Sequence, residues 1–541
     1  MDSIEPLEPR IAPAALTMGG KLLTYTDYDG DLVKISFTNA TMAEGNCDFG
    51  AGGFLPGDTT TKQQLGTVDL KGKTGAGFTL MAKPQMISGR LAGDSHADIF
   101  EIDGTNTDLG TIKVDGDVVS FPAGDMDFTN GPGIKSLTVL SIGRDSTAGV
   151  TFRVNRLGAL TVKSDFGPHA ALIIDGGAKS IFIGGSMLGT RDQEYGGIWV
   201  ASGDVGTFKV GGSLFGNFAN PFGNINVAGD VGTLSIHGSV IGDDYTSVGA
   251  NTPQIEISGG VKNLTIGGDV VGHSSEYGGA IEIRGDAGPI KIGGSLIGSD
   301  QSHTGYLRVR GNATTISIGH DVTGGNSTSS SGVQLTGAVV VNGSLGNLLI
   351  GGDFTAGRVY ASGLLAESGM VGISGTLGPV KIGGNIVGDP THLAYITAGG
   401  SGATAPTPAI KSLTVKGSVI SASILAGYDY SFVERNLLAG IGSVSIGGNL
   451  AGSFIIAGSN KGGDGIPGNS DDGKANNTTL ISSVKIDGAF TGLAGDATRF
   501  YVFAPQIGKL RVGAASYTGA QLTSPGVYFS SVGTAIVEAA G

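Results

Sequence analysis

The stretch Ile290-Lys291-Ile292-Gly293-Gly294-Ser295-Leu296-Ile297-Gly298 decides the fold, because close copies of it recur from near residue 109 to the last residues. In each copy, two apolar residues flank an outward Lys, Ser or Thr, which is the period-2 pattern of a strand with one buried face. The strand ends at glycine, and a small polar residue of a type that favours turns follows. The chain is therefore a repeat protein.

The copies align on the second glycine of this motif, and the commonest spacing is 26 residues, as from Gly268 to Gly294. A second strand-like run, such as residues 281–283, lies between copies, and a short third run, such as residues 296–297, follows the glycine turn. Three short strands in about 26 residues fit one coil of a parallel β-helix. A propeller blade needs roughly 40 residues and four strands, and the leucine spacing of a leucine-rich repeat is absent.

We therefore predict an all-β fold, a right-handed parallel β-helix (solenoid) of about sixteen coils with an N-terminal β cap. The coil is predicted to be right-handed because parallel crossovers in one sheet nearly always are. Residues 1–16 are expected to form a disordered leader, residues 17–64 a β-rich cap and residues 65–541 the helix, with a long loop at 453–480.

Residues at equivalent places in successive copies should stack inside the helix. Ile266, Ile292 and Ile318 are consecutive members of one such predicted column. The same alignment places the last two copies of the motif at Ala514 and Ala539. A single coil buries too few aliphatic side chains to offset its conformational entropy, so the coils are expected to fold only as a stack.

The composition limits the classes of partner. Lys and Arg number 33 against 46 Asp and Glu, a net charge of −13, which argues against nucleic acid and anionic membranes. The single cysteine, Cys47, excludes an internal disulfide framework. No apolar run approaches roughly 18 residues, so no membrane insertion is expected, and the N-terminus lacks the pattern of a standard signal peptide.

The first candidate metal site is the segment Asp27-Tyr28-Asp29-Gly30-Asp31, which places three carboxylates at alternate positions around a glycine. This spacing lets several oxygens converge on one hard cation such as Ca²⁺. A simple Asp-Gly turn before a strand explains the same residues. The sequence leaves both hypotheses open.

A second set of oxygen ligands lies in the polar stretch of the long loop. Its members are Asp464, Asn469, Asp471 and Asp472, spaced around glycines. They are candidate calcium ligands, and a solvated polar loop is the alternative. Neither segment matches the Gly-Gly-x-Gly-x-Asp repeat that binds calcium in some parallel β-helices.

The hypothesis of an enzyme rests on analogy, because parallel β-helices often carry polysaccharide lyases and hydrolases. Hydrolysis needs two carboxylates about 5 to 9.5 Å apart. Glu256 and Glu282 are 26 residues apart, so stacking would bring them onto adjacent coils. With Arg308 in the next coil, the same residues also fit a plain charge ladder. Aromatic residues make up only 6% of the chain, and Trp199 is the sole tryptophan, which is little for a sugar-binding cleft.

One resemblance covers most of the chain. Leu7-Glu8-Pro9-Arg10 followed by Ile-Ala-Pro-Ala resembles the LEPR-type tag at the start of large, repeat-rich exported proteins of certain Gram-negative bacteria. The segment from Thr24 to Asp31 and the Ile-Gly-Gly-Ser-Leu-Ile-Gly repeats are also similar to those proteins. The resemblance implies a β-helical protein of the extracellular space or outer cell surface, in a family whose biochemical role is generally unassigned.

These observations lead us to expect a non-enzymatic structural or adhesive protein that binds polysaccharide or other cell-surface components. No site is assigned as catalytic, and Ca²⁺ is the one cofactor that the sequence suggests. The alternatives are a carbohydrate-active β-helix enzyme, either a polysaccharide lyase or a glycoside hydrolase, and an autotransporter-like passenger fragment.

Overall fold

The computed structural model describes residues 15–17, 19–27, 29–49, 64–87, 90–124, 133–143, 150–168, 170–189, 197–216, 225–242, 254–326, 333–358, 365–366, 368–389, 391–402, 406–463, 473–492, 499–518, 522, 527–529 and 534–539. Within these residues the structure is almost entirely β, with a short 3₁₀ turn at Glu44–Asn46. No helix of the described residues has both the length and the apolar character that crossing a bilayer requires.

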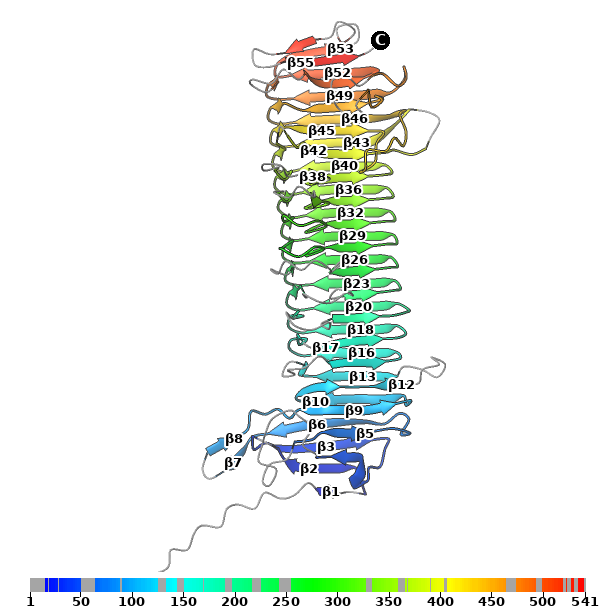
Figure 1. Ribbon diagram of the computed structural model, residues 1–541, viewed down its shortest axis with the longest axis vertical. Helices are drawn as coiled ribbons and strands as arrows, with labels where there is room; N and C mark the ends of the chain where they lie inside the picture. The colour runs from blue at the N-terminus through cyan, green and yellow to red at the C-terminus, as the bar shows by residue number, and fades with distance from the viewer. Residues whose placement is uncertain are drawn as a thin grey trace, which may run out of the picture. The chain divides into compact units, whose positions relative to one another are not determined.

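The protein is a parallel β-helix, as the repeat spacing predicts (Figure 1). The chain divides into two compact units, Met1–Thr233 and Leu234–Gly541. In the second unit each coil contributes a strand to each of three columns, which correspond to the three strand-like runs of the sequence repeat. Strands within a column pair in parallel with the equivalent strands of the neighbouring coils.

The first column of the second unit holds β26 (Val261–Ile266), β29 (Ala287–Ile292), β32 (Ala313–Ile318), β36 (Leu345–Ile350), β40 (Leu377–Ile382), β43 (Thr407–Val415), β46 (Ala439–Ile446), β49 (Leu480–Ile486) and β52 (Gln506–Val512). The second holds β25 (Ile255–Ile257), β28 (Ile281–Ile283), β31 (Leu307–Val309), β35 (Val339–Val341), β39 (Met370–Ile373), β42 (Ala394–Ala398), β45 (Ala422–Ala426), β48 (Phe454–Ala457), β51 (Arg499–Ala504) and β55 (Thr534–Ala539). The third holds β24 (Val240–Ile241), β27 (Val270–Val271), β30 (Leu296–Ile297), β33 (Val322–Thr323), β37 (Phe354–Thr355), β41 (Ile386–Val387), β44 (Val419–Ile420), β47 (Leu450–Ala451) and β50 (Phe490–Thr491).

The interior columns follow the predicted register. Ile266 pairs with Ile292, and Ile292 pairs with Ile318. All three side chains are buried, while Lys291, between two inward residues of β29, is exposed. The period-2 pattern therefore sends one face of each strand into a continuous aliphatic interior.

The polar residue after the two glycines connects successive coils. The amide of Ser295 donates to Asp269 Oδ1 at 2.7 Å, and the amide of Asp321 donates to Ser295 Oγ at 3.2 Å. A Cβ atom on Gly294 would collide with Asp269 Oδ1, so the glycine leaves room for the side chain of the coil before it. The repeat thus needs both glycine and a small acceptor at this corner.

The loops after the third-column strands pack against the outer face of the second column. Val340 points away from the interior in β35 and is nevertheless buried. It belongs to a cluster with the buried Tyr306 and Met370, and Tyr277 packs against this cluster. The loops at 273–277 and 299–305 therefore lie along one side of the coils, where they cover the sheet.

The first unit begins with antiparallel strands. β1 (Ala15–Thr17), β2 (Leu22–Thr26), β3 (Leu32–Thr38) and β6 (Gly77–Lys83) pair in that order, all antiparallel. The other edge of β6 pairs in parallel with β10 (Leu109–Val114), the first strand of the parallel column. The expectation of a disordered leader over 1–16 is wrong at its end, because Ala15 and Leu16 belong to β1; residues 1–14 lie outside the described part.

Two further expectations need correction. The predicted loop at 453–480 contains β48, so the polar excursion begins only after Ala457 and ends at β49. The C-terminal end is also not a plain continuation of the repeat, because β53 (Ala515–Thr518) turns back antiparallel to β52. Ala539 is the last residue of β55, and this strand pairs with β51 of the second column, so it does not continue the first column.

Candidate metal centre

The three aspartates of the first candidate site lie between the end of β2 and the start of β3. Asp27 Oδ1 accepts hydrogen bonds from the amides of Gly30 at 3.1 Å and Asp31 at 2.7 Å. Gly30 has a φ of 112°, which glycine adopts without strain. This part of the structure is the Asp-Gly turn of the simpler hypothesis, and it closes the β2–β3 hairpin.

The same turn brings the carboxylates together. Asp27, Asp29 and Asp31 each place one carboxylate oxygen within 4.8 Å of the others. Asp27 is 5% exposed and Asp31 is 0% exposed, whereas Asp29 is exposed to solvent. A hairpin turn does not require two buried carboxylates, so the arrangement exceeds what the turn alone explains.

A loop more than sixty residues further along the chain covers this turn. The amide of Asp94 donates to Asp29 Oδ2 at 2.8 Å, and the amide of Ser95 donates to Asp31 Oδ2 at 2.8 Å. Ser95 has a φ of 73°, an unusual value for a residue with a side chain. A Cβ atom on Gly93 would collide with Asp31 Oδ1, so only glycine lets the loop approach so closely.

No lysine or arginine of the described residues pairs with the acidic cluster. Among the described residues, no lysine or arginine nitrogen lies within 4.0 Å of the Asp27, Asp29 or Asp31 carboxylates. Burial, together with the hydrogen bond and the negative charge of Asp29, raises the pKa of Asp27 to about 8. Burial and the charge of Asp29 also raise the pKa of Asp31. The site therefore holds its carboxylates in a setting that penalises their anionic form.

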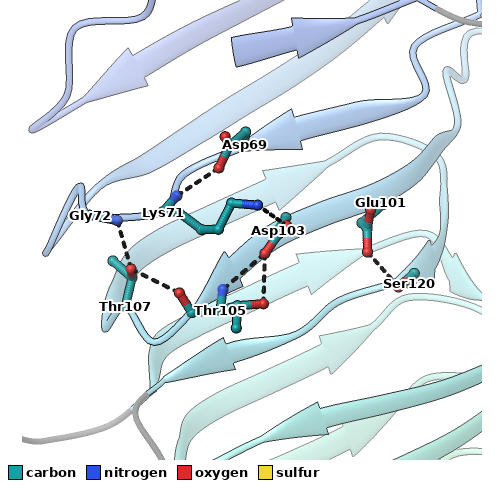
Figure 2. Close-up of polar contacts among 8 residues, drawn as sticks. All are labelled: Asp69, Lys71, Gly72, Glu101, Asp103, Thr105, Thr107 and Ser120. Atoms are coloured by element: carbon teal, nitrogen blue, oxygen red, sulfur yellow. Dashed lines mark hydrogen bonds and ion pairs between the residues drawn. The ribbon is translucent and has the colours of Figure 1, made fainter.

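A second acidic pair in the same unit has a lysine bound to one of its carboxylates (Figure 2). Asp69 of β5 (Thr67–Asp69) and Asp103 of β9 (Ile99–Thr105) are direct partners in the parallel ladder. Lys71 Nζ donates to Asp103 Oδ2 at 2.7 Å, and Thr105 donates to Asp103 Oδ1 from its amide and its hydroxyl. Partial burial alone would raise the pKa of Asp103, but these bonds lower it. Here, unlike at the Asp27 cluster, a described lysine contacts one of the carboxylates.

The second set of predicted calcium ligands, Asp464, Asn469, Asp471 and Asp472, lies outside the described residues. The segments on either side of it are described. Ser459 and Lys474 form an isolated antiparallel bridge, and Asn460 Oδ1 accepts a hydrogen bond from the amide of Gly473 at 2.8 Å. These contacts close the base of the polar excursion.

The glutamates considered for hydrolysis do lie on adjacent coils. Glu256 and Glu282 are direct partners in the β25–β28 ladder, and both are about nine-tenths buried or more. Each carboxylate, however, is ion-paired with an arginine of the following coil: Arg284 pairs with Glu256, and Arg310 contacts Glu282. The arrangement is the charge ladder of the plainer hypothesis, with partners that differ from the expected Arg308.

Arg308 instead belongs to an aromatic group beside that ladder. Its guanidinium donates to the Tyr430 hydroxyl at 3.0 Å and lies 5.5 Å from the centre of the Tyr430 ring. The Tyr277 and His303 rings stack with their centres 4.5 Å apart. Tyr277 and Tyr430 both pack against the buried cluster over the second column, so these rings serve first as packing for the loops.

Comparisons of the chain with protein-family models, curated proteins and solved structures give no significant match. The chemistry of the site must therefore be inferred from its own residues.

The sequence reveals one half of the candidate site and misses the other. The Asp-x-Asp-Gly-Asp spacing identifies the ligands of the hairpin. Gly93, Asp94 and Ser95 carry the composition of a turn, but no local pattern links them to a hairpin more than sixty residues earlier. The pairings of β6 with β3 and β10, and of β5 with β9, are long-range contacts that hold this part of the chain near the cap, and local sequence does not reveal them.

Proposed function

We propose that this chain is a non-enzymatic β-helical protein with a structural or adhesive role, exported or displayed at the cell surface, and that it binds polysaccharide or matrix. The observation that carries the proposal is the outer face of the first strand column in the second unit. There Thr315 pairs with Asn347, and Ser412 pairs with Ser443, each on the next coil. None of these four side chains is buried.

This face repeats one kind of contact many times. Parallel strands in register are about 4.8 Å apart, so the outward side chains of the column are spaced at that interval, and most of them carry a hydroxyl, amide or amine, with Pro289 and Pro379 as exceptions. The exposed Lys291 and Lys381 add positive charge to the same face. A repeating polymer can make a weak contact at each coil, and several weak contacts made together give useful affinity. A periodic and largely polar face, interrupted by the exposed Leu349, suits adhesion better than it suits catalysis.

A second candidate function, a carbohydrate-active enzyme, has one supporting observation. Glu282 lies close enough to Tyr306 for its charge, after burial, to raise the pKa of that tyrosine, so a carboxylate does adjoin aromatic rings. The ion pair with Arg310 argues against a catalytic role, because the Glu282 carboxylate is already engaged by a guanidinium of the next coil.

Incubation of the purified full-length protein with a panel of polysaccharides, scored for retention and for release of reducing ends, tests both functions. We expect retention by at least one polysaccharide and no depolymerisation. Ser443→Arg and Ser412→Arg should weaken retention, because a long charged side chain interrupts the periodic face. Ser431→Arg, in an exposed loop beyond β45, is the matched control and should leave retention unchanged.

Two results would contradict the proposal. Release of reducing ends that disappears in Glu282→Gln would identify an enzyme. Failure to retain any polysaccharide or matrix component would remove the adhesive role.

A further inference from the structure

The environment of the Asp31 side chain indicates that the acidic cluster is a binding site as well as a turn. Its side chain is 0% exposed, and no hydrogen-bond donor among the described residues reaches its Oδ1 atom. The other oxygen, Oδ2, accepts the amide of Ser95. A buried carboxylate oxygen without a partner is costly. The structure therefore contains an unfilled acceptor inside a cluster of three carboxylates.

We propose that Asp27, Asp29 and Asp31 bind one Ca²⁺ ion, which joins the β2–β3 hairpin of the N-terminal cap to the loop at 93–95. The inference goes beyond the proposed function and does not depend on it. A bound cation would supply a partner for Asp31 Oδ1 and balance three carboxylates that no described lysine or arginine contacts.

The spacing of the oxygens fits calcium. Ligand oxygens lie about 2.3 to 2.6 Å from Ca²⁺, so two of them on opposite sides of the ion can be about 4.6 to 5.2 Å apart. One oxygen of each carboxylate lies within 4.8 Å of the others, a separation that is compatible with one shared calcium ion. Mg²⁺ demands near-ideal octahedral geometry and gives up its water reluctantly, so we expect it to bind here more weakly.

Water and the loop at 93–95 provide the rest of the proposed site, and the bound ion would hold that loop in place. Calcium takes about six to eight oxygen ligands, and the exposed Asp29 leaves an open side through which water can supply the remainder. Asp94 adds a fourth negative charge, which acts on Asp31. Since the amides of Asp94 and Ser95 already bind two of the carboxylates, a cation held by those carboxylates would fix the loop against the hairpin.

The test uses the full chain freed of divalent ions with a chelator. Calcium is titrated by calorimetry, and hydrogen exchange is followed at the amides of residues 94 and 95. We expect calcium to slow exchange at both amides, and magnesium to do so more weakly. Asp29→Asn should weaken binding at this site about tenfold or more, because one charged ligand is lost. Asp48→Asn, an exposed carboxylate of the same cap, is the matched control and should change neither readout.

Asp31→Asn separates loss of the ion from loss of the fold. This variant removes a buried charge, so in chelator its cap should exchange no faster than that of the parent chain, yet calcium should no longer slow the exchange. The proposal is overturned if calcium leaves the exchange of residues 94 and 95 unchanged in the parent chain. It is equally overturned if Asp48→Asn lowers the affinity as much as Asp29→Asn does.

Discussion

At the scale of the residue, stability depends most clearly on the buried side chains of the interior column. Ile292 is buried between Ile266 and Ile318 of the neighbouring coils. Replacing it with alanine leaves a cavity that parallel strands in register cannot easily close. We expect Ile292→Ala to lower the free energy of unfolding by about 2 to 5 kcal/mol. Urea denaturation measures this cost, and the exposed Lys291→Ala should stay within about 0.5 kcal/mol of the parent chain.

The polar residues that follow the two glycines of each coil contribute less to stability, through hydrogen bonds between neighbouring coils. Asp353 Oδ1 accepts the amide of Asn385 at 2.6 Å, and Asp353 donates its own amide to Asp321 Oδ1 at 2.7 Å. Asp353→Ala removes one acceptor and should cost about 1 kcal/mol. Asp353→Asn keeps an acceptor of the same shape, as Asn385 itself does in the next coil, and should be nearly neutral. Equal losses for both variants in thermal unfolding would show that charge, not the hydrogen bond, matters here.

His392 gives the second unit a dependence on pH. Its Nε2 atom lies 3.1 Å from the carbonyl oxygen of Ser368, and burial lowers its pKa below the ordinary value of 6.5. As the pH falls through 6.5, the unfolded chain takes up a proton that the folded chain resists. The stability linked to His392 is therefore complete above pH 6.5 and is lost as the pH falls toward the folded pKa.

Unfolding midpoints between pH 5 and pH 8 check this expectation. The parent chain should lose stability on acidification more steeply than His392→Gln, which keeps a donor but cannot titrate in this range. Identical slopes for the two proteins would show that the burial of His392 has no energetic consequence.

At the scale of the element, the ends of the helix differ from its middle. β52 pairs with the antiparallel β53, and β51 pairs with β55, so both columns end in strands that cover an edge. A bare terminal coil would present unpaired amides and carbonyls to other molecules. We expect a chain that ends at Gly513 to form soluble aggregates.

Size-exclusion chromatography with light scattering measures that outcome. A chain that lacks residues 1–14 is the control, because the first described pairing begins at Ala15, and it should elute as the parent chain does. A truncated chain that stays as well dispersed as the parent would contradict the capping role of β53.

The sequence predicts the middle of each element better than its boundaries and partners. The alternation around Lys291 and the two glycines that follow it define strand, corner and register, because each coil repeats the same local forces. Ala539 shows the limit of this approach. Its strand has the same alternation as the motif, yet it lies in the second column, since alternation reports a buried face and not the neighbouring strand.

At the scale of the whole molecule, the fold follows from the sequence while the completed site does not. Stacking is a consequence of repetition, so the column Ile266, Ile292 and Ile318 can be identified without a structure. The approach of Gly93 to Asp31 depends on how a single antiparallel cap joins the first coils. The contact between Gly93 and Asp31 is not part of the repeat, so sequence periodicity does not predict it.

The central claim is that residues a coil apart in sequence lie directly above one another. Thr265, Ser445, Lys485 and Arg511 occupy one outward column of the second unit. Spin labels on Thr265 and on each of the others, in a chain with the native Cys47 replaced by alanine, allow pulsed electron paramagnetic resonance to measure the distances. Ser445, Lys485 and Arg511 lie six, seven and eight coils from Thr265, so we expect about 29, 34 and 38 Å.

The step from Ser445 to Lys485 adds 40 residues and the step from Lys485 to Arg511 adds 26, yet each should add the same increment of about 4.8 Å. Distances that grow with the number of residues, or broad distributions without a defined maximum, would contradict the stack of coils.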